Sequence, residues 1–310
     1  MLSRVADAIF WMTRYMERTK IEATFLHTNY VAIQDNAISN NWKLVLQKYG
    51  DKEFMLKHGD RDYQSSETLL HLITDKENPS SIVNNVMYAR ENARSVQDHI
   101  TKEMWQSLNN FYHTIRNEKN ELAILNEDPI EVMDMLQQQC YLFSGTMDYT
   151  MDRGSGYYFQ NIGKRLERIF QAIHILTIKL KEIGNQVNED ANVLSFRYVL
   201  YALSGNELFG KTYRGDLNIR NIINFVLFDP VFTNSIHYSL GRLKTSIVPI
   251  RQDSTLIAYE HIEYEIGKLI SNFTYSKPDI QDGEKLLQYL HDLEKEITKW
   301  SAHFSTLYFG

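Results

Sequence analysis

Apolar residues recur along the N-terminal segment at alternating steps of three and four positions. They are Leu2, Val5, Ile9, Met12, Met16, Ala23, Leu26, Tyr30 and Ile33, with Thr19 in the single gap. Because an α-helix completes a turn every ~3.6 residues, this spacing gathers the apolar side chains on one face. The pattern predicts a long amphipathic helix over 2–33, with a heptad-like seam that packs against a partner.

The same periodicity predicts helices along the rest of the chain. Asn78-Pro79 is typical of a helix cap followed by proline at the first helical position, and an apolar stripe runs from Ile82 to Val96. Further helices are expected over 101–118, 129–151, 157–183, 190–203, 217–228, 232–248, 256–273 and 282–305. Segment 50–66 is expected to be an exposed loop. Strand-like alternation is not sustained, so the sequence predicts an all-α fold, a large bundle of about ten or more helices.

Three short sequence words occur twice in the same order. Trp42–Leu46 matches Phe196–Leu200, the stretch ending at Asp75 matches the stretch ending at Asp229, and Arg14–Arg18 matches Lys164–Arg168. The first two matches share an offset of 154 residues and the third has an offset of 150. Recurrence in a fixed order favours an internal duplication over chance.

The duplication leads to a prediction for the domain organisation. We expect one all-α domain over 1–310, with a first half-repeat at 1–150 and a second at 151–250. Amphipathic helices need partners, so the halves are expected to share one core around a pseudo-twofold axis. Segment 251–310 has no match in the first half and is expected to form C-terminal helices that cover the bundle.

Composition narrows the class of protein. Only 14 Gly and 5 Pro occur in 310 residues, which leaves little turn material for a sheet-based fold. A net charge of -6 argues against non-specific nucleic-acid binding, which needs a basic surface. The most apolar run, 222–228, is too short to span a membrane and contains Asn224. The single cysteine, Cys140, rules out an internal disulfide and suits a reducing cytoplasm. We therefore expect a cytoplasmic protein that binds neither nucleic acid nor membrane.

A charged motif with the pattern basic-x-x-Glu-Arg is the most informative local feature. It occurs near the N-terminus as Arg14-x-x-Glu17-Arg18 and in the second half as Lys164-x-x-Glu167-Arg168. Residues three and four positions apart are neighbours on a helix, so each copy forms a compact charged cluster.

Two further groups extend the charged set. Arg4 and Arg18 share a helical stripe with Trp11, which indicates a semi-buried surface where guanidinium groups stack on rings. The helix after Pro79 carries two arginines and a glutamate within about one turn. The candidate ligand-binding or ion-pair residues are therefore Arg4, Arg14, Glu17, Arg18, Arg90, Glu91, Arg94, Glu167 and Arg168.

Spacing alone leaves two interpretations of these residues open. One is a network of salt bridges between helices that fixes their register, because buried Arg-Glu pairs need full partnering. The other is a polar pocket at the pseudo-twofold interface, in which arginines hold an anionic ligand and a glutamate acts as acid or base. Converging charges from both halves, Glu17 and Glu167 among them, are common to both interpretations.

Other chemistry finds little support in the sequence. Neither HExxH nor the ExxH pair of helical di-iron proteins occurs, and Asp75 and Asp229 precede turns, so no metal is expected. Phosphate-cradling loops are also missing, and no cofactor is expected. Cys140 lies in an apolar helical context and is expected to be an inert core thiol. No catalytic residue is assigned.

Several of these motifs resemble the bacterial alpha-E family, which is named for its helical content and its Glu-Arg motif. The resembling segments are Met1–Ala6, Trp11–Arg18, Asn78–Ile82, Ala89–Arg94, Glu103–Asn109 and Gly163–Arg168. They are spread over roughly 1–250. Thr13, Thr19 and Lys164 are mild departures from the family pattern.

The resemblance implies a partner rather than an activity. Proteins of this family resemble partners of a circularly permuted ATP-grasp ligase, often beside a transglutaminase-like protein and sometimes a proteasome-like one. We therefore expect a helical accessory or binding protein that acts with an ATP-grasp-type ligase in peptide synthesis or modification, without catalysis of its own. The alternative is an enzyme that uses the Arg/Glu cluster on an anionic peptide or an acyl phosphate. A self-associating helical scaffold is a third possibility, and the sequence gives no oligomeric state.

Overall fold

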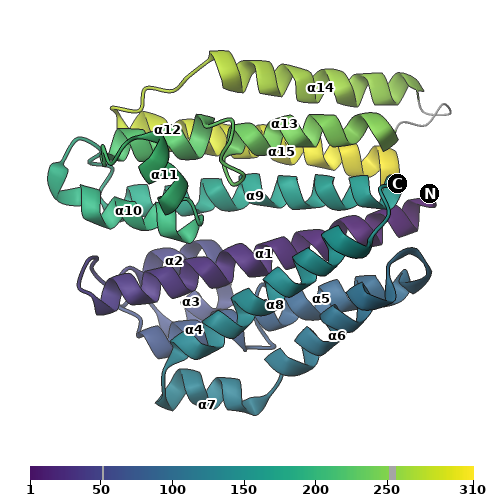
Figure 1. The fold of residues 1–310 in the computed structure, drawn as a ribbon. Helices are drawn as coiled ribbons and strands as arrows, with labels where there is room; N and C mark the ends of the chain where they lie inside the picture. The colour runs from purple at the N-terminus through teal and green to yellow at the C-terminus, as the bar shows by residue number, and fades with distance from the viewer. Residues whose placement is uncertain (51, 251–255) are drawn as a thin grey trace. The chain divides into compact units, whose positions relative to one another are not determined.

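The computed structural model describes residues 1–50, 52–250 and 256–310, and the regular structure in these ranges is helical (Figure 1). It comprises fifteen α-helices and three short 3₁₀ helices, with no strand in the described part of the chain. The predicted all-α class is confirmed. Among the helices described, none combines the length and the apolar character that crossing a bilayer requires. The predicted boundary between 250 and 251 adjoins residues 251–255, which lie outside the described residues.

The chain divides into two compact units. The C-terminal unit contains Met1–Arg14, Asp152–Leu200 and Ser204–Gly310, and the N-terminal unit contains Tyr15–Met151 and Tyr201–Leu203. The division after Met151 lies next to the predicted boundary between the half-repeats. Helix α1 (Ser3–Gln34) confirms the long N-terminal helix, and it contributes its first turns to one unit and the remainder to the other.

Four long helices form the main body of the C-terminal unit. They are α9 (Ser155–Glu182), α13 (Ile236–Ile247), α14 (Leu256–Tyr275) and α15 (Gly283–Phe309). Helix α9 packs on α13, α13 on α14, α14 on α15, and α15 returns to α9 (Figure 1). Phe159 and Phe304 lie in the buried aromatic core between α9 and α15. Helices α11 (Asn206–Thr212) and α12 (Ile219–Phe228) also belong to this unit, as does α10 (Val193–Ala202) up to Leu200.

Shorter helices build the N-terminal unit. They are α2 (Trp42–Tyr49), α3 (Lys52–His58), α4 (Ser65–Ile73), α5 (Ile82–Ser95), α6 (Lys102–Ile115), α7 (Glu118–Asn126) and α8 (Pro129–Thr150). Helix α6 packs on α5 and α8, and α7 packs on α4 and α8. The prediction of an exposed loop over 50–66 was wrong for Lys52–His58, because these residues form α3. Phe54 anchors this short helix, because its ring stacks on that of His71 with centroids 3.8 Å apart.

A similar turn precedes α5 in one unit and α13 in the other. Ser81 caps α5 by accepting from the backbone N–H of Asn84 at 3.4 Å, and Ser235 caps α13 by accepting from that of Tyr238 at 3.0 Å. The two serines are 154 positions apart, and so are the two donor residues, which is the offset found in the sequence. The two units therefore share the same serine N-cap at corresponding positions of the sequence. Internal duplication of the whole chain stays a prediction.

Candidate functional site

Gly163 on α9 permits a close approach of α1 within the C-terminal unit. A Cβ atom at this position would lie 2.6 Å from the carbonyl oxygen of Phe10 and 3.3 Å from Cγ of Arg14. A side-chain rotation cannot relieve a contact with a backbone atom, so this packing requires glycine. The close approach brings the side chain of Arg14 to that of Glu167, one turn further along α9.

Arg14 and Glu167 form a buried ion pair. Arg14 Nε donates to Glu167 Oε2 at 2.9 Å, and the two side chains are 11% and 1% exposed. Gln171, one turn after Glu167, donates from Nε2 to Oε1 at 3.1 Å. The guanidinium also lies over Trp11, with its carbon 4.6 Å from the ring centroid. Both carboxylate oxygens are therefore hydrogen-bonded, which offsets the cost of burying the charge.

The predicted charged residues of α5 form a second cluster, in the N-terminal unit. Glu91 accepts from Arg90 Nη1 at 2.8 Å through Oε1 and from Arg94 Nη2 at 2.6 Å through Oε2. Arg90 Nε donates to Oδ1 of Asn109 on α6 at 2.8 Å, and its guanidinium carbon lies 5.4 Å from the Trp105 ring. Glu91 is 41% exposed and Arg94 is 63% exposed, so this cluster lies at the surface. Its contacts join two of the motifs that carry the family resemblance.

The remaining predicted residues have varied surroundings. Arg4 is exposed, Arg18 is half-buried and Glu17 is buried, with 3% of its surface accessible. Arg168 is also buried and donates from Nη1 to the carbonyl oxygen of Thr233 at 3.1 Å. Arg168 therefore holds the segment that leads into α13.

The structure thus brings Arg14 and Glu167 together and, separately, groups the three residues of α5. Glu17 belongs to the N-terminal unit and Glu167 to the C-terminal unit. The expectation that these two carboxylates converge on one pocket stays a prediction. Within each unit, the geometry favours the salt-bridge interpretation over an open anion pocket, because each carboxylate for which the pairing is described accepts from two donors.

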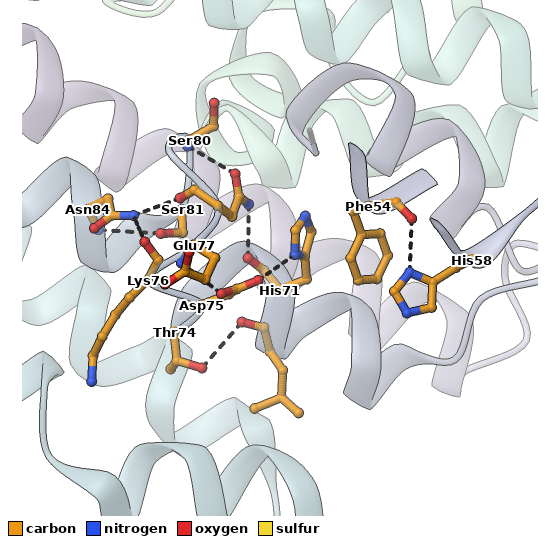
Figure 2. Close-up of polar contacts among 12 residues, drawn as sticks. Phe54, His58, His71, Thr74, Asp75, Lys76, Glu77, Ser80, Ser81 and Asn84 are labelled. Atoms are coloured by element: carbon orange, nitrogen blue, oxygen red, sulfur yellow. Dashed lines mark hydrogen bonds and ion pairs between the residues drawn. The ribbon is translucent and has the colours of Figure 1, made fainter. Parts of the chain in front are cut away.

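Hydrogen bonds from asparagine side chains close the turn between α4 and α5 (Figure 2). Asn78 Nδ2 donates to the carbonyl oxygen of His71 at 2.9 Å, and its Oδ1 accepts from the backbone N–H of Ser80 at 3.0 Å. Asn84 Nδ2 donates to the carbonyl oxygens of Lys76 at 2.9 Å and Asn78 at 2.7 Å. Buried backbone groups need such partners, so this sequence motif has a structural role at the start of α5.

A His-Asp pair in the same turn was missed from the sequence (Figure 2). His71 Nδ1 lies 2.8 Å from Asp75 Oδ2, and the other oxygen of Asp75 accepts from the backbone N–H of Glu77 at 2.9 Å. A carboxylate on Nδ1 fixes the orientation of an imidazole, as it does in catalytic triads. The His71 side chain is only 3% exposed, so the pair braces the turn. The signal was available as a His and an Asp four positions apart at the end of a helix.

A basic cluster around Tyr238 was also missed. Arg242 Nε donates to the Tyr238 hydroxyl at 3.2 Å, and the Arg165 guanidinium carbon lies 5.1 Å from the centre of the Tyr238 ring. The hydrogen bond from Arg242 lowers the pKa of Tyr238; partial burial opposes it, and the charges of Arg165, Arg242 and Arg168 lower it further. The available signal was a Tyr and an Arg four positions apart on α13.

A third unpredicted group lies at the C-terminal end of α9. Lys179 Nζ pairs with Glu182 Oε2 at 2.8 Å, and the Ser195 hydroxyl donates to Oε1 of the same glutamate at 2.6 Å. Lys179 is 1% exposed, and this burial lowers the pKa of its ammonium group, with Glu182 opposing the shift. The group ties α10 to α9.

The residues considered for metal or nucleophilic chemistry have structural surroundings. In the ranges that the structure describes, no three or more His, Cys, Asp or Glu side chains are grouped so that they could hold a metal ion. Asp229 accepts at Oδ1 from the backbone N–H groups of Val231 at 2.8 Å and Phe232 at 2.7 Å, as expected for a turn residue. Cys140 is buried, and burial raises the pKa of its thiol, which disfavours the reactive thiolate.

A comparison with protein families bears on the charged motif. The family described as a predicted alpha-helical domain with a conserved ER motif, Alpha-E, matches residues 1–309. The chain belongs to the Alpha-E family. Glu-Arg pairs occur in this Alpha-E chain at Glu17-Arg18 and at Glu167-Arg168. The match includes the C-terminal segment after residue 250, where the resemblance of individual motifs was weaker.

Two curated proteins are similar to this Alpha-E chain. One is from Mycobacterium bovis and the other from Mycobacterium tuberculosis, and both are described as uncharacterized. Each is 23% identical over 262 residues, which cover 79% of this chain and 29% of the relative. The chain therefore corresponds to less than a third of the length of these relatives. No solved structure matches it.

Proposed function

We propose that this chain is a helical accessory and binding protein that acts in the cytoplasm with an ATP-grasp-type ligase in peptide synthesis or modification, without catalysis of its own. A transglutaminase-like protein is a second proposed partner. Membership of the Alpha-E family supports the general class of helical domain. The ligase, the peptide and the compartment are parts of the proposal.

The observation that carries the proposal is the length of the mycobacterial relatives. The region similar to this chain makes up only 29% of each of them, so most of the polypeptide lies outside it. Two parts of one polypeptide meet at an effective concentration near millimolar, without any additional contact. An Alpha-E chain that acts on a separate partner needs a binding surface to replace that linkage.

Exposed apolar side chains on α7 and α8 offer such a surface in the N-terminal unit. Leu122 and Leu125 of α7 are 54% and 52% exposed, and Leu142 and Tyr149 of α8 are 55% and 94% exposed. The two helices pack on each other. Large exposed apolar residues on adjacent elements are typical of protein contacts, where tyrosine often contributes much of the affinity. We assign the ligase contact to this surface, the α7–α8 surface.

The pairing of the acidic residues supports the absence of catalysis. A general acid or base must reach the proton that it transfers to or from a substrate. Glu167 is 1% exposed and both its oxygens accept hydrogen bonds, from Arg14 and Gln171. This arrangement favours a structural role over the enzyme alternative.

The test uses the full chain, an ATP-grasp-type ligase from the same organism, ATP and a peptide acceptor. Sedimentation velocity at micromolar concentrations should show a complex, and ADP release by the ligase should rise when the chain is added. Leu142→Asp changes an exposed α8 residue of the α7–α8 surface and should weaken the complex by about tenfold or more. Gln106→Asp adds the same charge at an exposed position of α6 and is the matched control.

Two results would count against the proposal. Equal affinity of the Leu142→Asp and Gln106→Asp chains for the ligase would contradict the assignment of the contact to the α7–α8 surface. The lack of any complex would contradict the proposal that the ligase is a partner. Consumption of the peptide acceptor by the chain without ligase would favour the enzyme alternative.

A further inference from the structure

Helix α12 is apolar except for three residues that share one face. Its sequence from Ile219 to Phe228 contains only Arg220, Asn221 and Asn224 as polar residues. Asn224 is three positions after Asn221 and four after Arg220, so it neighbours both residues on the helix surface. All three line a pocket of about 430 Å³ in the C-terminal unit. The polar face of α12 is therefore one wall of a concave site.

The segment before α10 supplies a second wall, which is acidic. Glu189 and Asp190 line the pocket at the start of the 3₁₀ turn Asp190–Asn192. Asn188 fastens this wall, because its Oδ1 accepts from Arg220 Nη2 at 2.8 Å and its Nδ2 donates to the carbonyl oxygen of Gln281 at 2.9 Å. The pocket thus combines carboxylates on one wall with a guanidinium on the other, held by direct hydrogen bonds.

Asn224 is the polar residue of this pocket wall whose side chain is open to a ligand. It interrupts the most apolar run of the sequence, is only partly exposed, and its side chain makes no hydrogen bond to any residue that the structure describes. A primary amide offers two donors and an acceptor in one plane. It can therefore donate to the C=O and accept from the N–H of a peptide main chain. The amide of Asn224 lies in the pocket wall and is therefore available to hydrogen-bond a ligand.

The lining selects among ligand classes. No aromatic residue is present among the described residues that line the pocket, so a sugar ring or a nucleobase lacks a stacking surface. Val187, Val193 and Ile280 add apolar side chains to the lining. A volume of about 430 Å³ lies within the ~300–1,000 Å³ typical of small-molecule sites. These features suit a short peptide with small side chains.

We propose that this pocket binds a short peptide, with Asn224 pairing a main-chain amide and Glu189 and Asp190 facing the free amino group. Arg220 lies on the other wall and suits the carboxylate end. The assignment deepens the proposed function and rests on it, because it names what an accessory protein for a peptide ligase holds.

Calorimetric titration of the full chain with trialanine, N-acetyltrialanine and maltotriose tests the pocket. Trialanine should bind, N-acetyltrialanine should bind several-fold more weakly, and maltotriose should not bind. Asn224→Ala should weaken trialanine binding by about tenfold, since it removes hydrogen bonds to the peptide. Asn110→Ala, at an exposed position of α6 outside the pocket, is the matched control and should leave affinity unchanged.

A second variant keeps the test decisive if Asn224→Ala fails to fold. Asp190→Asn changes one exposed side chain and should weaken trialanine binding without affecting N-acetyltrialanine. Three results would each contradict the proposal that this pocket binds a peptide. They are equal affinities of the Asn224→Ala and Asn110→Ala chains, tighter binding of maltotriose than of trialanine, and no binding of trialanine at about 1 mM.

The two proposals fail in different ways. A chain that binds trialanine but forms no complex with the ligase would contradict the proposed function and leave the pocket intact. A chain that forms the complex but binds no trialanine would contradict the pocket alone.

Discussion

Removing the carboxylate of Glu167 is the sharpest perturbation of the Arg14–Glu167 pair. In Glu167→Ala, the Arg14 guanidinium, in a side chain 11% exposed, loses its ion-pair partner. Gln171 loses the acceptor of its 3.1 Å hydrogen bond, and a small void replaces the removed atoms. The change therefore acts on a charge, a hydrogen bond and packing at once.

The magnitude follows from burial. Removing one partner of a buried ion pair costs about 3–5 kcal/mol, because the other charge stays buried without compensation. A domain of this size loses about 2–4 °C in Tm for each kcal/mol, so we expect a decrease of roughly 6–20 °C. The matched control is Glu91→Ala. It removes a side chain that is 41% exposed and breaks the cluster on α5, and it should cost at most about 1 kcal/mol after solvent screening.

The assay is thermal and urea unfolding followed by circular dichroism, with equal chain concentrations. The double variant Arg14→Met with Glu167→Leu replaces both charges by apolar groups and should recover most of the lost stability. Equal melting temperatures of the Glu167→Ala and Glu91→Ala chains would refute the reasoning. A double variant less stable than Glu167→Ala would show that the pair does not act as a unit.

Three further predictions concern packing, a tyrosine and the α4–α5 turn. Gly163→Ala places a Cβ atom 2.6 Å from the Phe10 carbonyl oxygen and should lower the free energy of urea unfolding by about 1–3 kcal/mol. Gly145→Ala has open space around its Cβ atom and should be neutral or stabilising, so similar values for both variants would contradict the packing argument. Burial raises the pKa of Tyr308 to about 12 from an ordinary value of 10.0, so the stabilising contribution of this tyrosine is present below pH 10 and is lost as the pH rises towards 12. Tyr308→Phe should therefore reduce the loss of unfolding free energy between pH 10 and 12, and an unchanged slope would exclude Tyr308 as its cause. Asp75→Ala removes the hydrogen-bond acceptor for His71 and for the Glu77 backbone, so amide hydrogen exchange should accelerate between α4 and α5. Unchanged protection of these amides from exchange would contradict the structural role of the His71–Asp75 pair.

Periodicity was enough to find the long helices, because several turns repeat the same apolar spacing. Helix α1 and helix α9 illustrate this, since each buries a continuous stripe. Helices α3 and α11 have seven residues each, which is too few for the spacing to be distinguished from a loop. Contacts such as that between Phe54 and His71 decide whether such segments become helical, and these contacts depend on the fold.

The sequence indicated the partners of Glu91 on α5 but not the partner of Arg14. The spacing of Arg14 and Glu17 suggested a cluster on one helix, whereas Arg14 pairs with Glu167, 153 positions away. That choice depends on how closely α1 approaches α9, and Gly163 sets this distance. The same limit applies to the pocket on α12. Asn224 was visible as an interruption of an apolar run, but its place in a pocket wall depends on segments far away in the sequence.

The most direct measurement of a non-catalytic role compares the wild-type chain with Glu167→Gln in the ligase assay, at a temperature where circular dichroism shows both to be folded. The substitution keeps the shape of the side chain and removes its capacity as a base. We predict that the folded variant binds the ligase with wild-type affinity and supports wild-type release of ADP and formation of the peptide product. A folded variant that binds the ligase normally but supports no product would contradict this and assign Glu167 to catalysis.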